Sequence, residues 1–122
     1  DFIKSPAQTV GTGTVTDSLG WAFYKIGDYE QAVKYLEKAS DQAPSEAVIY
    51  DHLGDAYWQV GRKREAVFQW NHALGLKDDT GEFNRQATLK KLENGLEKPT
   101  VLPFDQKEID KQIERLKAKE NS

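Results

Sequence analysis

Apolar positions recur at helical spacing over much of the chain, and glycine or proline separates the periodic stretches. Between about residues 15 and 26, they follow the i, i+3, i+4, i+7 pattern of one helix face: Leu19, Ala22, Phe23 and Ile26. Gly27 ends this helix, and Asp28 with Gln31 forms a capping box that starts a second helix reaching about residue 43. The pattern therefore predicts a pair of helices joined by a tight turn.

A second pair of helices is predicted after the first. Pro44 interrupts the chain, and Ser45 is a favourable N-cap for a third helix that extends to about residue 60. Gly61 ends this helix as Gly27 ends the first, and a fourth helix is predicted from about residue 63 to 74. Its inward-facing residues are expected to be Ala66, Val67, Trp70 and Ala73.

The two pairs are copies of one unit, because a shift of 34 residues superimposes glycine on glycine and apolar residue on apolar residue. The expected packing residues of the first copy are Leu19, Gly20, Phe23, Gly27, Ala32, Leu36 and Ala39. Those of the second copy are Leu53, Gly54, Tyr57, Gly61, Ala66, Trp70 and Ala73. Gly20 and Gly54 fall inside helices, where glycine costs roughly 1 kcal/mol against alanine. Their recurrence predicts close helix contacts at these two positions.

Each copy has Leu-Gly, an aromatic residue, a turn glycine, an alanine, a large apolar residue and a second alanine at matching positions. This arrangement resembles the tetratricopeptide repeat family. The resemblance implies an all-α fold with two helical hairpins, at residues 14–46 and 47–78, that acts as a non-catalytic scaffold for a protein or peptide partner. The phrases DSLGWAFYKIG and DHLGDAYWQVGRKREAVFQW look like the closing repeats of longer exported bacterial members. That similarity points to the bacterial periplasm or envelope, with the cytoplasm as the alternative.

The segments that flank the repeats are predicted to extend or close the stack. Residues 1–13 form either a flexible end or the remnant of a preceding repeat whose packing residues would be Phe2 and Ser5. Residues 79–96 form a capping helix that Asp79 and Glu82 start. Its apolar face consists of Phe83, Leu89, Leu92 and Leu96.

Residues 97–104 contain two prolines and are predicted to be a linker, and residues 105–120 a C-terminal helix that Asp105 and Glu108 start. The apolar groups of this tail are Phe104, Ile109, Ile113 and Leu116. Two repeats leave helix surface uncovered, so the tail is expected to dock on its own chain or on a second copy, which would make a homo-oligomer. A solvated helix is the alternative.

Composition and charge narrow the classes of function. The 122 residues are 30% charged with a formal net charge of −3, and the signs are mixed, so neither nucleic acid nor an anionic membrane is an expected partner. No apolar run approaches the roughly 20 residues of a membrane span. Without cysteine, thiolate metal sites and thiol nucleophiles are excluded, and no cofactor is expected. The chain also lacks methionine, which indicates a trimmed fragment or a mature product.

Catalytic chemistry has little support in the sequence. His52 and His72 lie at different points of their repeats and share no metal-ligand spacing. Asp51, His52 and Asp55 lie close together on one predicted helix, where a metal site or a pH switch is the minor alternative to a solvated histidine. The densest positive cluster, residues 62–64, falls at a turn and is expected to be solvated.

The resemblance also implies where a partner binds. In this family the first helix of each pair lines a concave face, through residues spaced 3, 4, 3 and 1. We call the corresponding residues here the concave stripe: Thr14, Asp17, Trp21, Tyr24 and Lys25, then Val48, Asp51, Asp55, Trp58 and Gln59. Its tryptophans and carboxylates favour a cationic or donor-rich partner. Packing of the same tryptophans against a neighbouring helix is the alternative.

The concave stripe disfavours one class of ligand. Chaperone-binding members of the family hold a terminal carboxylate with lysine, asparagine and arginine, and here Asp17, Trp21 and His52 stand at the corresponding places. An acidic chaperone C-terminus is therefore not an expected partner. The second function that the sequence allows is a structural or self-association module of a larger protein, with no ligand of its own. An enzyme is the least favoured class.

Overall fold

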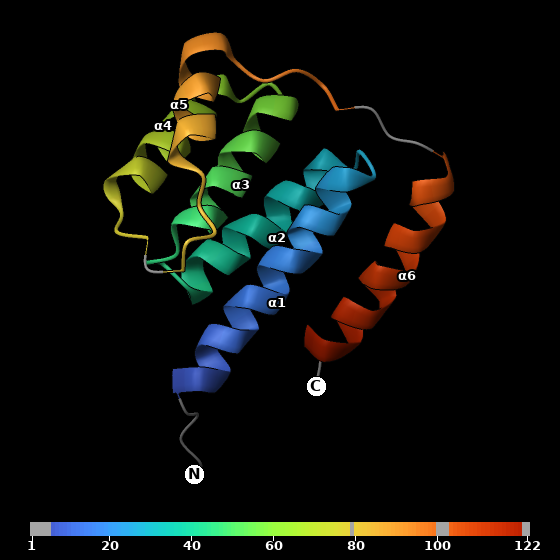
Figure 1. Cartoon of the computed structure of the whole chain (residues 1–122). Helices are drawn as coiled ribbons and strands as arrows, with labels where there is room; N and C mark the ends of the chain where they lie inside the picture. The colour runs from blue at the N-terminus through green and yellow to red at the C-terminus, as the bar shows by residue number, and fades with distance from the viewer. Residues whose placement is uncertain (1–5, 79, 100–102, 121–122) are drawn as a thin grey trace.

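The described part of the chain folds into six helices (Figure 1). The computed structural model describes residues 6–78, 80–99 and 103–120. The helices are α1 Pro6–Lys25, α2 Tyr29–Gln42, α3 Ala47–Gln59, α4 Lys63–Gly75, α5 Arg85–Asn94 and α6 Pro103–Glu120. Helices α1 and α2, and likewise α3 and α4, pack as antiparallel pairs, which confirms the predicted all-α fold. None of these helices is both long and apolar enough to cross a membrane.

Glycine in the left-handed region makes the tight turn inside each pair. Gly27 has φ 86° and Gly61 has φ 87°, a region that other residues adopt at a cost. In both turns the glycine N–H donates to the carbonyl three residues back, and the next N–H donates to the carbonyl five residues back. Asp28 then caps α2 by accepting the Gln31 N–H at 3.3 Å, as predicted.

The two glycines inside helices lie where the paired helices come closest. A Cβ on Gly20 would stand 2.7 Å from Cγ of Leu36, and a Cβ on Gly54 would stand 2.5 Å from Cδ1 of Trp70. Both distances are far inside van der Waals contact, so each glycine makes room for a large side chain of the facing helix. Leu36 and Trp70 are fully buried as a result. The close approach explains why glycine recurs here despite its helix penalty.

Helix α1 begins at Pro6, so residues 6–13 are helical and do not form a flexible end. Proline is compatible with the first helical turn, because an N–H would have no intrahelical partner there. Gly13 allows close packing in this stretch, since a Cβ at this residue would lie 2.8 Å from Cβ of Ala43. The predicted packing residues Phe2 and Ser5 lie outside the described residues.

The starts of α3 and α6 also differ from the prediction. Helix α3 begins after Glu46 instead of Ser45, because the Glu46 N–H donates to the Ala43 carbonyl at 3.2 Å and Ser45 lies in the turn that this bond closes. Helix α6 begins at Pro103, so the predicted cap Asp105 lies inside the helix. Proline again stands at the first helical position, where its fixed φ favours the helix.

The capping helix α5 starts later than predicted. Asn84 caps it by accepting the Ala87 N–H at 3.0 Å, whereas the predicted cap Asp79 lies outside the described residues. The carboxylate of Asp78 accepts hydrogen bonds from three backbone N–H groups of the loop that follows it. These bonds hold residues 80–83 in a loop, so the helix begins only after them.

Most of the buried side chains form one cluster across α1 to α4, to which α6 contributes Ile113. Val67 of α4 was expected to face this cluster, but it is 36% exposed, and its neighbour Phe68 is 67% exposed. The prediction for Val67 is wrong, because α4 buries the face that carries Ala66 and Trp70, and Val67 lies outside that face.

Helix α6 lies along α1 of the same chain, on the side away from α3 and α4 (Figure 1). Ile113 is buried, and Ile109 and Leu116 pack against the same cluster. The side chain of Phe104, the fourth apolar group of the tail, lies outside the described part. The apolar stripe of α6 is therefore used within the chain.

Polar contacts hold the far end of α6. Glu120 forms a salt bridge with Lys38 of α2 at 3.1 Å and accepts a hydrogen bond from Thr16 of α1 at 3.4 Å. The ammonium of Lys117 lies 5.5 Å from the centre of the Phe23 ring. These contacts fix the position of α6 along α1 and α2.

We expect Gly54→Ala to lower the free energy of unfolding by about 2–3 kcal/mol, because the new methyl group would overlap the Trp70 ring. The control is Gly75→Ala at the end of α4, where a Cβ would meet no atom within 4 Å. That change should be neutral or stabilise by up to about 1 kcal/mol. Urea unfolding measures both variants, and equal stability of the two would contradict the close contact at Gly54.

We expect Ile113→Ala to loosen α6 while the two helix pairs stay folded, because Ile113 is the most buried apolar group of α6. Amide hydrogen exchange in α6 should become roughly 10- to 100-fold faster, with little change in α2 and α3. Lys111→Ala, at an exposed position of α6, is the control. Unchanged exchange in α6 would show that Ile113 does not hold this helix.

Candidate functional site

Three aromatic rings are stacked between α1 and α3. The ring centroids of His52 and Trp21 lie 3.9 Å apart, those of Trp21 and Tyr24 lie 4.4 Å apart, and both pairs are nearly parallel. Trp21 and Tyr24 share one face of α1 at i, i+3 spacing, whereas His52 comes from α3. The stack therefore joins the two repeats. Trp21 is partly exposed, and Tyr24 is buried.

Asp17 of α1 fixes the orientation of His52. One oxygen of its carboxylate lies 2.9 Å from Nδ1 of His52, and the two side chains keep exposed fractions of 14% and 18%. Because a carboxylate only accepts, Nδ1 of His52 is the donor. The stacked indole thus lies beside a carboxylate and an imidazole, both with hydrogen-bonding capacity.

Lys91 of α5 occupies the acidic part of the concave stripe. Its ammonium lies 2.8 Å from a carboxylate oxygen of Asp51 and 2.8 Å from one of Asp55, both on α3. Thr88, one turn earlier in α5, donates to Asp51 at 2.7 Å, and the Trp70 indole of α4 donates to Asp55 at 2.9 Å. The two carboxylates that the sequence assigned to a partner are therefore used inside the chain.

Burial controls the charge of Asp55. It raises the pKa of Asp55 from its ordinary value of 3.8 to about 6, although the charge of Lys91 counteracts part of this rise. Burial also works against the charged form of Lys91, but the charges of Asp55 and Asp51 outweigh it and raise the pKa of the ammonium. Lys91 therefore stays charged, whereas Asp55 can gain a proton in weakly acidic solution.

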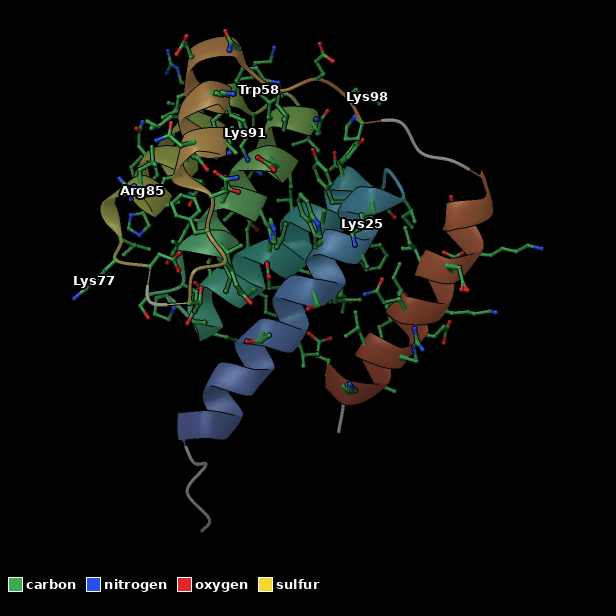
Figure 2. All side chains as sticks on the ribbon, viewed as in Figure 1. Lys25, Trp58, Lys77, Arg85, Lys91 and Lys98 are labelled. Carbon is green, nitrogen blue, oxygen red and sulfur yellow. The ribbon has the colours of Figure 1, made fainter. Side chains whose placement is uncertain are left out.

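The segment after α5 covers the end of the concave stripe. A Cβ on Gly95 would lie 2.8 Å from Cζ2 of Trp58, so the backbone of this segment lies directly on the indole. Gln59 donates to the Glu97 carbonyl at 3.0 Å and to the Tyr24 hydroxyl at 3.3 Å. Figure 2 draws the described side chains and labels Trp58 and Lys91.

The structure thus divides the concave stripe into an open part and a covered part. Both tryptophans are partly exposed, as predicted, but Gly95 lies on one of them. The open part consists of exposed or partly exposed residues on α1 and at the start of α3: Thr14, Asp17, Trp21, Lys25 and Val48. The covered part consists of residues that are buried or that contact α5 or the segment after it: Tyr24, Asp51, Asp55, Trp58 and Gln59.

The sequence analysis missed the residues that cover the stripe, namely Thr88 and Lys91 of α5 and Gly95 directly after it. Thr88 and Lys91 are three residues apart, so helical spacing puts them on one face of α5. That spacing could have grouped them. The sequence does not show that this face of α5 meets α3, because the apolar residues of the segment predict that a different face is buried.

The structure bears on the metal site, the pH switch and the basic cluster that the sequence analysis considered. Asp51 and Asp55 bind Lys91, whereas His52 bonds Asp17, so these three residues do not converge. Across the described ranges, no group of three or more histidine, cysteine, aspartate or glutamate side chains could hold a metal ion. Residues 62–64 are exposed, as expected, but only Arg62 precedes α4, whose first two residues are the other two.

Two family models match the centre of the chain. One, described as "TPR repeat", matches residues 20–61, and the other, described as "Tetratricopeptide repeat", matches residues 47–80. This part of the chain belongs to the tetratricopeptide repeat family. Tetratricopeptide repeats are generally protein–protein interaction modules, and their domains are typically non-catalytic.

The matches to curated relatives cover half of this chain or less. The "Hsp70-Hsp90 organising protein" of Plasmodium falciparum is 36% identical over 61 residues, which is 50% of this chain and 24% of that protein. The "Vi polysaccharide export protein VexE" of Salmonella typhi is 38% identical over 58 residues, which is 44% of this chain and 9% of that protein. The chain therefore spans less than a quarter of the length of these relatives. No solved structure matched the chain.

The raised pKa of Asp55 predicts a pH dependence of stability. A carboxyl group whose folded pKa exceeds its unfolded value binds a proton more tightly in the folded chain. The stability that it contributes is therefore lost as the pH rises from about 4 through about 6. We expect Asp55→Asn to remove this loss. The free energy of unfolding of the variant relative to the parent should rise by roughly 2–3 kcal/mol between about pH 3.5 and pH 7.

Urea unfolding across this pH range measures the difference. Asn keeps an oxygen that can accept the Trp70 indole hydrogen bond, so the comparison isolates the charge. Asp110→Asn on α6, at an exposed position, is the control for loss of a carboxylate. A difference between Asp55→Asn and the parent that is constant with pH would contradict the raised pKa.

Proposed function

We propose that the chain is a non-catalytic scaffold that binds a protein or peptide partner through the open part of the concave stripe. The observation that carries this proposal is the stack of His52, Trp21 and Tyr24, which fixes a partly exposed indole between the two repeats. A ring that is already immobilised offers contact area without a further loss of rotamer entropy on binding. Such rings are typical anchors of protein interfaces.

The groups beside Trp21 define the chemistry of the partner. One oxygen of Asp17 accepts the hydrogen bond from His52, which leaves the second oxygen for a donor of the partner. Because Asp51 and Asp55 bind Lys91, Asp17 is the acidic group that remains in the open part. We therefore propose a partner segment with an apolar side chain over the indole and a cationic or donor-rich side chain next to it.

The match to a protein named "Hsp70-Hsp90 organising protein" does not change this ligand class. The three positions expected to hold a terminal carboxylate carry Asp17, Trp21 and His52 here. The negative charge of Asp17 would repel a carboxylate, and Trp21 cannot supply a charge for it. We therefore propose that an acidic C-terminal tail is not the partner.

A structural module with no ligand of its own is the second candidate function. It is favoured by the way in which α5 and α6 cover surfaces of the two repeats within one chain. Because the apolar stripe of α6 packs against its own α1, self-association through that stripe would require α6 to leave α1. This candidate differs from the first in that no binding depends on Trp21.

Peptides selected on the whole chain by phage display provide the probes for a test. We expect Trp21→Ala to weaken their binding by roughly 30-fold or more, the effect of removing a central aromatic anchor. Gln86→Ala, at an exposed position of α5, is the control and should leave the dissociation constant unchanged. Fluorescence anisotropy measures the affinities, and a thermal melt by circular dichroism checks the fold of each variant. If the peptides bind Trp21→Ala as tightly as the parent, the structural module is favoured instead.

A further inference from the structure

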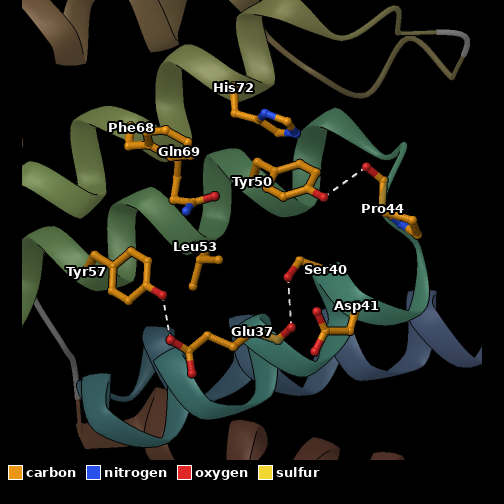
Figure 3. Close-up of a pocket in the computed structure, with 10 residues that line it drawn as sticks. All are labelled: Glu37, Ser40, Asp41, Pro44, Tyr50, Leu53, Tyr57, Phe68, Gln69 and His72. Carbon is orange, nitrogen blue, oxygen red and sulfur yellow. Dashed lines mark hydrogen bonds between the residues drawn. The ribbon is translucent and has the colours of Figure 1, made fainter.

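Apart from the concave stripe, the chain has a cavity of about 620 Å³ between α2, α3 and α4 (Figure 3). It uses a different face of α3 from the concave stripe, and none of its lining residues belongs to that stripe. Figure 3 shows carboxylates on the α2 side and aromatic rings on the α3 and α4 sides. The residues that matter for its chemistry are Glu37, Asp41, Tyr50, Tyr57, Phe68 and His72.

The aromatic walls of this cavity are fixed by contacts within the chain. The Tyr50 hydroxyl donates to the Pro44 carbonyl at 2.9 Å, and the His72 ring meets the Tyr50 ring edge-on with 4.4 Å between centroids. Phe68 lies at the rim, 67% exposed, with its ring parallel to that of His72 at 6.4 Å. The cavity thus offers π faces and an exposed apolar rim.

The acidic wall is formed by Glu37 and Asp41, one helical turn apart on α2. The Tyr57 hydroxyl donates to one oxygen of Glu37 at 2.5 Å. Burial and the contact with Glu37 raise the pKa of Tyr57, so the phenol keeps its proton and remains a donor. Glu37 accepts this bond on the α2 side of the cavity, and Asp41 is exposed beside it.

The described lining of the cavity contains two carboxylates and neither lysine nor arginine. The guanidinium of Arg62 lies 4.4 Å from the centre of the Tyr57 ring. Arg62 donates two hydrogen bonds of 3.0 and 2.7 Å to Glu65, and its charge also acts on Glu37. Its position shows that Tyr57 presents a ring face to which a guanidinium packs.

We propose that this cavity binds an arginine side chain of a partner protein. The guanidinium would lie between the Tyr50 and Tyr57 rings and pair with Glu37 and Asp41, while the aliphatic stem would contact Phe68. A planar guanidinium suits these walls because it stacks on aromatic rings and donates to carboxylates at the same time. An anionic group would be repelled by the two carboxylates.

This site is independent of the open part of the concave stripe. The concave stripe lies on α1 and α3, whereas the cavity lies between α2, α3 and α4. Because the two sites share no residue, each can be inactivated separately. The test therefore uses substitutions in each site and follows the amide resonances of the whole chain by two-dimensional NMR.

The probe is N-acetyl-arginine amide, and its neutral isostere N-acetyl-citrulline amide is the control ligand. We expect the arginine probe to shift amide resonances of residues that line the cavity in a saturable manner, and the citrulline probe to cause no saturable shift. The double variant Glu37→Gln, Asp41→Asn should weaken arginine binding at least about tenfold. Gln at position 37 keeps an acceptor for the Tyr57 hydroxyl, which preserves the local fold.

Two further variants make the outcome specific. Glu30→Gln, at an exposed position of α2 outside the cavity, and Trp21→Ala in the concave stripe should leave the arginine affinity unchanged. Equal binding of citrulline, or unchanged binding to the double variant, would overturn the arginine site. Shifts that cluster around Asp17 and Trp21 and disappear in Trp21→Ala would also overturn it, while supporting the concave stripe as the place where cations bind.

Discussion

The contact between Gly54 and Trp70 is the interaction on which the second repeat depends. Because position 54 has no side chain, the indole of α4 fits against the backbone of α3 and is fully buried. In this position its N–H donates to Asp55, and Asp55 together with Asp51 binds the ammonium of Lys91. The placement of α5 on α3 therefore follows from a missing methyl group on α3 itself, next to Asp55.

The two ends of the repeat pair are covered by different kinds of contact. Helix α5 is attached by a polar network in which the charge of Lys91 balances two carboxylates, and such a network depends on the protonation state of its members. Helix α6 is attached by an apolar stripe around Ile113, with one salt bridge at its far end. The first contact also engages Asp51 and Asp55 of the predicted binding face, so the attachment of α5 and the choice of ligand surface are linked.

The sequence predicted the helix pairs well because their signals are local or repeated. Glycine turns and the 34-residue period depend on residues close in the chain or on exact copies of them, and the structure has both turns in the expected places. The contents of the concave stripe were harder to predict. Whether Asp55 faces a partner or Lys91 depends on how α5 turns its faces, and α5 has only a weak apolar pattern. The exposure of Val67 was also hard to predict, because it depends on which parts of the chain pack against α4.

The return of α6 to α1 has a consequence for the order in which the chain acquires its structure. The hydrogen bond from Thr16 to Glu120 joins residues 104 positions apart, whereas each helix pair is built from contacts between sequence neighbours. Local contacts form before distant ones, because closing a long loop has a larger entropic cost. During synthesis the two repeats can therefore fold while the apolar side of α1 is still bare, and this side remains accessible to chaperones until residues 103–120 have left the ribosome.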